Sequence, residues 1–69
     1  MVTNVLKEIR MKQYMMNKKE FASMLEIAEQ QYGRYENMSV VPSLEVALRV
    51  SCILDKPVNE IFKLENSSK

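Results

Sequence analysis

The chain has 69 residues, one cysteine, no histidine and a formal net charge of +1 at pH 7. A single cysteine excludes an internal disulfide, and without histidine a structural zinc site lacks its usual ligands, so we expect neither a metal nor a cofactor. With 46% hydrophobic residues, one glycine and two prolines, the composition favours a single all-helical domain over residues 1–69.

The distribution of charged residues argues against secretion and membrane insertion. Charge begins at Lys7, too early for the apolar stretch of a signal peptide, and no run of about 18 apolar residues is present. We therefore expect a cytoplasmic protein that does not bind a membrane. The net charge does not indicate a nucleic-acid partner, and a basic cluster over residues 7–19 is more typical of a solvated surface than of a binding site.

Helical spacing and capping residues predict the first two helices. Apolar residues behind Asn4 favour a helix over residues 4–13, followed by a linker over residues 14–16. The second helix opens at Asn17, because Glu20 follows three residues later and the two side chains can cap each other's backbone N–H groups. Its inward face is formed by Phe21, Ala22 and Leu25.

A change in the phase of the apolar pattern predicts a tight turn near Glu26. The third helix then spans residues 29–36 and ends at residues 37–39, where Asn37 tolerates the left-handed conformation that closes a helix. Ser43 is expected to cap a fourth helix that runs to about Leu54 and is apolar nearly all round.

Pro57 is expected to start a short fifth helix. This helix contains Val58, Ile61 and Phe62, and residues 63–69 form a short polar tail, frayed over residues 66–69.

The segment over about residues 17–36 has the order of a helix, a tight turn and a second helix, an arrangement that proteins use to enter the DNA major groove. Ala22 is small enough for the two helices to approach closely, and Tyr32 and Tyr35 hold the second helix on the core. The other face of that helix presents Glu29, Gln30, Gly33 and Arg34.

Five blocks of sequence carry a family resemblance. They are Leu6 with Ile9 and Arg10, MNKKEFASMLEI over 16–27, YGRYEN over 32–37, PSLEVAL over 42–48, and PVNEIF over 57–62. In order and spacing they resemble the lambda-repressor/Cro-like, or XRE-type, helix-turn-helix regulators. The resemblance covers about residues 4–62 and implies five helices, recognition of DNA by the third, and a structural ion pair between Arg10 and Glu36.

Three residues depart from the family pattern. Glu26 stands where the turn usually has glycine, and a positive φ there costs about 1 kcal/mol. Ala28 stands where serine or threonine usually caps the recognition helix, a loss of about 1 kcal/mol. Met38 stands where glycine usually ends that helix.

The chemistry of the exposed side chains predicts contacts with DNA. Gln30 suits adenine, Arg34 guanine, and Glu29 the N4 amino group of cytosine. The sugar-phosphate backbone is expected to meet the start of the second helix, and Asn37 resembles a family backbone contact. Gly33 allows close approach to DNA or reflects drift at a tolerant position, and both interpretations stay open. The predicted interface is Asn17, Lys18, Ala28, Glu29, Gln30, Gly33, Arg34 and Asn37.

Surplus apolar residues at the C-terminal end predict a homodimer. Leu44, Ala47, Leu48 and Leu54 are expected to face the core, which leaves an exposed apolar patch of the kind that marks an association site. The predicted interface is Val46, Val50, Ile53, Val58, Phe62 and Leu64. Such a dimer would place two recognition helices ~34 Å apart on a pseudo-palindromic operator in double-stranded DNA.

The favoured hypothesis is a sequence-specific transcriptional regulator, and a repressor because the chain has no room for an activating domain. A second hypothesis is a protein-interaction module, such as an antitoxin or adaptor. This hypothesis is supported by acidic Glu29, by Gly33 and by the near-neutral net charge. An enzyme is least favoured, because no catalytic residues, histidine or phosphate-binding glycine loop can be identified.

Overall fold

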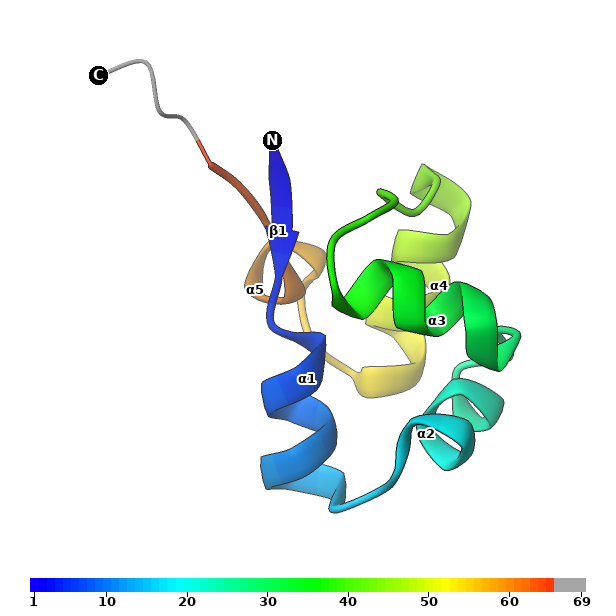
Figure 1. Cartoon of the computed structure of the whole chain (residues 1–69). Helices are drawn as coiled ribbons and strands as arrows, with labels where there is room; N and C mark the ends of the chain where they lie inside the picture. The colour runs from blue at the N-terminus through cyan, green and yellow to red at the C-terminus, as the bar shows by residue number, and fades with distance from the viewer. Residues whose placement is uncertain (66–69) are drawn as a thin grey trace.

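The computed structural model describes residues 1–65, and within them five α-helices, one π-helical segment and two short strands surround one core (Figure 1). The elements in chain order are β1 (Val2–Asn4), α1 (Leu6–Glu8), η1 (Ile9–Tyr14), α2 (Lys18–Met24), α3 (Glu29–Glu36), α4 (Leu44–Leu54), α5 (Val58–Ile61) and β2 (Phe62–Leu64). The all-helical prediction is confirmed, with the strands as a minor addition. None of these helices is long and apolar enough to span a bilayer.

The first helical segment begins at Leu6, two residues later than predicted. Asn4 ends strand β1, but its Oδ1 still accepts a hydrogen bond from the Leu6 N–H at 3.1 Å. From Ile9 onward the backbone widens to π-helical hydrogen bonding, and left-handed Met15, with φ 51°, ends the segment. The side chain of Asn4 therefore supports the start of α1 from within the strand.

The start of α2 has the predicted capping box. Asn17 Oδ1 accepts from the Glu20 N–H at 2.8 Å, and Glu20 Oε1 accepts from the Asn17 N–H at 3.2 Å. Two backbone donors that no helical carbonyl can reach are thereby paired.

The predicted tight turn lies between α2 and α3, and Glu26 within it is left-handed, with φ 62°. α3 spans Glu29–Glu36, and Ala28 precedes it without a side-chain cap. The prediction for the end of α3 is wrong at one residue, because Asn37 has φ −89° and Met38 has φ 65°. The side chain of Asn37 instead turns to the following loop, where its Oδ1 accepts from the Ser39 N–H at 2.9 Å.

Ser43 caps α4 as predicted, and the predicted buried face of this helix is right at Ala47 and Leu54 but wrong at Leu44 and Leu48. Ala47, Val50 and Leu54 are buried, whereas Leu44 is 72% and Leu48 50% exposed. An apolar pattern that runs nearly all round a helix does not select one face. The position of α4 against the other helices selects the stripe at positions 47, 50 and 54.

The two ends of the described chain meet in an antiparallel pair of strands that the sequence did not predict. Val2 pairs with Leu64 and Asn4 with Phe62. Phe62 therefore lies in β2 rather than in α5, and residues 63–64 belong to the strand rather than to a tail. The predicted frayed tail at residues 66–69 lies outside the described residues.

The core draws residues from every helix. Phe21 and Tyr32 have their ring centroids 5.5 Å apart in an edge-to-face arrangement, which favours aromatic packing. The largest fully buried side chains are Tyr32, Phe21, Leu6, Leu25, Ile61 and Val50. Because α2 and α3 both insert an aromatic ring here, packing in the core fixes the position of α3 relative to α2.

Candidate nucleic-acid interface

α3 has one face in the core and one face in solvent. Tyr32 is fully buried and Tyr35 is 6% exposed, while the opposite side of the helix presents exposed polar groups. The predicted base-contacting residues lie on that outer side, with Glu29, Gln30 and Arg34 exposed and Gly33 half-buried. The helix thus offers a polar surface on a backbone that aromatic packing holds in place.

A buried ion pair anchors the C-terminal end of α3 to η1. Arg10 Nε lies 2.9 Å from Glu36 Oε2, and the Arg10 Nη1 group donates to the Met16 carbonyl at 3.0 Å. The Tyr32 hydroxyl donates to the same Glu36 oxygen at 2.7 Å. The guanidinium therefore joins η1, the linker before α2, and α3.

The environment of Glu36 keeps its carboxylate charged. Burial raises the pKa of Glu36, but the hydrogen bonds from Arg10 and Tyr32 outweigh burial, and the net pKa lies below its ordinary value. Burial, followed by the hydrogen bond to Glu36, raises the pKa of Tyr32. The tyrosine therefore stays a neutral donor and the glutamate a charged acceptor.

The start of α2 lies beside the end of α3. Lys18 Nζ lies 3.8 Å from Glu36 Oε1, and the lysine side chain is 54% exposed. Asn17 is exposed, but the capping box engages its Oδ1, so its amide nitrogen is the group left for an external acceptor. Both residues can reach solvent from a fixed helix start.

Asn37 and Ala28 mark the two ends of α3, and both are exposed. Asn37 Oδ1 accepts from the Ser39 N–H and also from the Ser39 hydroxyl at 2.6 Å. Its amide nitrogen is a donor directed away from this loop interaction. Ala28 adds no polar group, so any contact it makes with a partner is apolar or through the backbone.

Gly33 is not required by the fold. It has no positive φ, and a Cβ atom added there would meet nothing within 4 Å. Neither the backbone conformation nor packing within the protein therefore explains a glycine in the middle of α3. Close approach by a partner and tolerance of drift both remain consistent with this geometry.

Two further residues at this site were missing from the sequence-based prediction. Gln31 donates from Nε2 to the Tyr35 hydroxyl at 3.2 Å and accepts at Oε1 from Arg34 Nη1 at 3.4 Å. Helical spacing of three and four residues could have indicated these contacts. Arg49 of α4 donates from Nη2 to the Glu26 carbonyl of the turn at 3.3 Å, a contact for which the sequence carries no signal.

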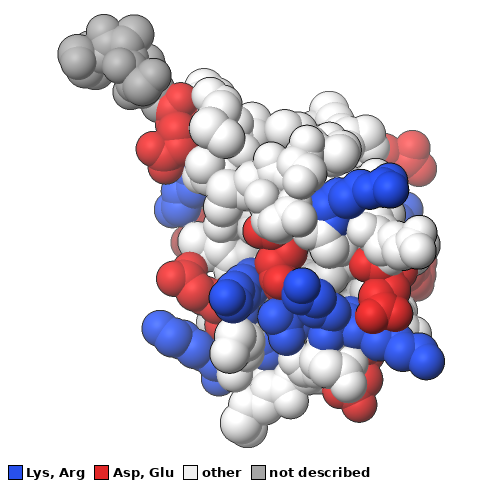
Figure 2. Space-filling view, in the orientation of Figure 1, with Lys and Arg blue, Asp and Glu red and all other residues white. Residues whose placement is uncertain are grey.

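Charged side chains are unevenly spread over the face that α3 occupies. Figure 2 shows lysines and arginines gathered over the lower half, interleaved with acidic groups, while the upper half is mostly uncharged. The exposed large apolar residues of the α3–α4 loop and of α4 are Met38, Val40, Val41, Leu44 and Leu48, and Met1 and Leu64 lie at the sheet. Met11 within η1 and Met15 at its end are also exposed.

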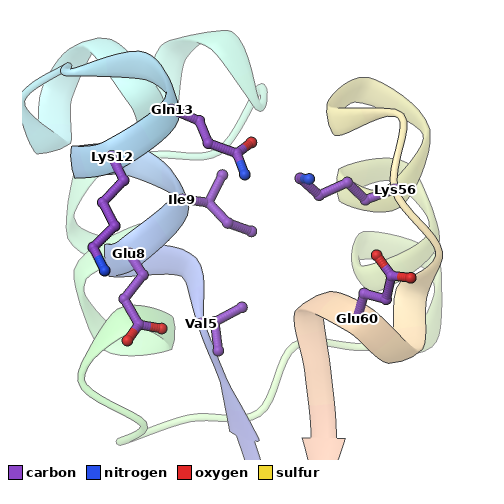
Figure 3. Close-up of a pocket in the computed structure, with 7 residues that line it drawn as sticks. All are labelled: Val5, Glu8, Ile9, Lys12, Gln13, Lys56 and Glu60. Carbon is purple, nitrogen blue, oxygen red and sulfur yellow. The ribbon is translucent and has the colours of Figure 1, made fainter.

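A shallow groove of about 250 Å³ lies between the α1–η1 segment and the α4–α5 connection (Figure 3). Apolar Val5 and Ile9 line it together with charged groups from both sides. The lining residues are Val5, Glu8, Ile9, Lys12, Gln13, Lys56 and Glu60. Because each side of the groove carries one lysine and one glutamate, the groove lacks the uniform charge that would attract a nucleic acid.

A comparison with protein families matches a helix-turn-helix model to residues 6–61. The chain belongs to the helix-turn-helix family. The match runs from the start of α1 to the end of α5, so it includes the Arg10–Glu36 ion pair and excludes both strands. A comparison with curated proteins finds no match.

The family assignment agrees with the XRE-type resemblance and fixes the general function. Helix-turn-helix domains of this family bind double-stranded DNA. In this member, α2 and α3 are the motif, with left-handed Glu26 at the turn.

Proposed function

We propose that this helix-turn-helix protein is a sequence-specific transcriptional repressor that binds operator DNA as a homodimer. The observation that carries the proposal is the division of α3 into a buried aromatic face and an exposed polar face. Occupying a site that overlaps a promoter is sufficient to exclude polymerase, so repression needs only the binding surface.

The exposed face of α3 supports contacts with base edges. Arg34 can form two parallel hydrogen bonds with guanine, and Gln30 can do the same with adenine. Glu29 can accept from the N4 amino group of cytosine, and at other base pairs its charge opposes binding. Because these three side chains share one face, a single insertion of α3 brings them to the major groove together.

Residues that flank α3 support contacts with the phosphate backbone. Lys18 and Asn17 lie at the start of α2, and Asn37 lies at the end of α3. Lysine and amide groups that contact phosphate set the register of a protein on DNA without reading its sequence. We assign these residues to positioning, and Ala28 to the close approach of the α3 backbone.

The proposed dimer interface differs from the one that the sequence predicts. Val50 is 1% exposed and belongs to the core, and Val46, Ile53 and Phe62 pack against the core, so they offer little free surface. The exposed apolar side chains lie instead on the α3–α4 loop, on the outer side of α4 and at the sheet.

We assign dimerisation to these exposed apolar side chains, which are Val40, Val41, Leu44, Leu48 and Leu64. Two-fold pairing of one apolar patch with itself is the commonest way in which soluble proteins form dimers. A second copy would bring two α3 helices to successive major grooves, ~34 Å apart.

The test is a titration of labelled duplex DNA from the region upstream of the gene, at two salt concentrations, with Arg34→Ala as the control. We expect binding to weaken steeply as salt rises, because lysines and arginines displace counterions from phosphate. We also expect the variant to lose sequence preference. A folded, dimeric protein that binds this duplex no better than random DNA would refute the proposal.

One observation favours a second function, that of a protein-interaction module such as an antitoxin or adaptor. Glu29 places a carboxylate on the exposed face of α3, where it repels phosphate unless a suitable base faces it. This alternative predicts binding to a protein that changes little with salt. The salt series above therefore separates the two functions.

A further inference from the structure

Gln31 lies between the buried and exposed faces of α3 and contacts a residue of each. Its Nε2 donates to the Tyr35 hydroxyl at 3.2 Å, and its Oε1 accepts from Arg34 Nη1 at 3.4 Å. The guanidinium has only donors, so the amide oxygen of Gln31 must be the atom that faces it. The phenol then faces the amide nitrogen, and the orientation of the whole side chain is determined.

The anchor on the buried side is packed in the core. Tyr35 is 6% exposed, and its backbone carbonyl accepts from Asn4 Nδ2 at 2.8 Å. The hydrogen bonds therefore run from strand β1 through Tyr35 to Gln31 and end at Arg34. The position of the exposed arginine is tied to the core in this way.

The hydrogen bond from Gln31 leaves most of Arg34 free for a partner. A guanidinium carries five N–H donors, and this contact uses one of them. The remaining donors include a parallel pair of the kind that meets guanine. An arginine side chain has many rotamers and loses conformational entropy when it binds. A contact that restricts these rotamers before binding makes that loss smaller.

We propose that Gln31 is a positioning residue that orients Arg34 for guanine and so sets the sequence preference of α3. This inference rests on the proposed function, because it requires Arg34 to read a base. It assigns to Gln31 an effect on discrimination between sequences and no direct contact with DNA.

The experiment uses Gln31→Met, which keeps the length and helical preference of the side chain but removes both hydrogen bonds. Tyr35→Phe is the matched second variant, because it removes only the hydroxyl that orients Gln31. Each change is made in the wild-type chain and in the Arg34→Ala chain. Binding is measured to the operator duplex and to duplexes in which the base pair read by Arg34 is replaced, and circular dichroism checks folding.

In the wild-type chain we expect Gln31→Met to reduce the preference for the operator base pair by about threefold to tenfold, the effect of freeing one side chain. Tyr35→Phe should act in the same direction to a smaller extent. In the Arg34→Ala chain neither change should have any further effect. Such non-additive behaviour is the signature of a residue that acts through another.

Three results would overturn the inference. Gln31→Met could weaken binding to all duplexes equally, in the Arg34→Ala chain as well as in the wild-type chain. In that case Gln31 contacts the sugar-phosphate backbone of DNA directly. If Arg34→Ala abolishes the preference while Gln31→Met and Tyr35→Phe leave it unchanged, Arg34 needs no positioning and only this inference fails. If the wild-type chain has no sequence preference, the proposed function fails together with it.

Discussion

Arg10 Nε lies 2.9 Å from Glu36 Oε2, and the two side chains are only 10% and 6% exposed. The pair joins residues that are 26 positions apart in the sequence. Because Tyr32 donates to the same carboxylate, Glu36 accepts hydrogen bonds from both a guanidinium cation and a buried phenol. α3 is therefore held by polar contacts as well as by apolar packing.

Replacing Arg10 with methionine should destabilise the fold by about 3–5 kcal/mol, because the carboxylate of Glu36 would remain buried without its cation. Urea unfolding followed by circular dichroism measures the change. Lys18→Met is the control, since its longer, exposed contact with Glu36 predicts a change within about 0.5 kcal/mol. Equal effects of the two changes would contradict a special role for the buried pair.

Stability should fall in acid through Glu36. Its folded-state pKa lies below its ordinary value of 4.5, so the unfolded chain takes up the proton first as the pH falls. The stabilisation is therefore present above about pH 4.5 and is lost as the pH falls through the folded-state pKa. Urea unfolding from about pH 7 to about pH 3 should show wild type and Glu36→Gln converging. If the difference in the free energy of unfolding between wild type and Glu36→Gln stays constant over this pH range, the linkage to Glu36 is disproved.

Glycine at position 26 should stabilise the protein. Glu26 has φ 62°, a conformation that disfavours residues with a Cβ atom, and Glu26→Gly removes this cost. The added flexibility of the unfolded chain offsets part of the gain, so we expect a net increase of about 0.5–1 kcal/mol in the free energy of unfolding. Met38→Gly, at φ 65°, is a second test of the same argument, and a loss of stability in both variants would reject it.

Alanine at position 33 should stabilise α3 by about 1 kcal/mol, because alanine is the better helix former and its Cβ would lie in open space. Thermal unfolding measures this gain. DNA affinity then separates the two interpretations of Gly33. A more stable variant that binds operator DNA less tightly has lost a close approach, and one that binds equally well shows that the position tolerates drift.

Lysine at position 44 should convert the proposed dimer to a monomer without unfolding it, because Leu44 is 72% exposed. In a two-fold interface the two introduced lysines would face each other, and two positive charges would be desolvated side by side. Sedimentation velocity measures the molecular mass. Met11→Lys is the control, since Met11 is 53% exposed on η1 and away from the proposed interface. A dimer that survives Leu44→Lys would place the contact elsewhere.

Local signals in the sequence were sufficient to predict the recognition unit. The Asn17–Glu20 capping box, the turn at Glu26 and the start of α4 behind Ser43 are each decided by neighbouring residues, and the structure agrees with all three. The exposed face of α3 likewise follows from its helical period and its two buried tyrosines.

Features that depend on tertiary contacts could not be predicted in this way. α4 is apolar nearly all round, so only its packing shows that Val50 is buried and Leu44 exposed. The pairing of Val2 with Leu64 joins segments that carry no local signal for each other. The contact of Arg49 with the Glu26 carbonyl depends on side-chain direction across two distant segments, which sequence spacing alone does not give.

The pairing of β1 with β2 has a consequence for the order in which the chain folds. Contacts within and between neighbouring helices join residues that are close in sequence, whereas this sheet closes a loop that contains every described helix. Loop-closure entropy grows with the length of the loop, and distant contacts slow folding. We therefore expect the strands to acquire protection from hydrogen exchange after α2 and α3, so that the helix-turn-helix is assembled before the two ends of the described chain come together.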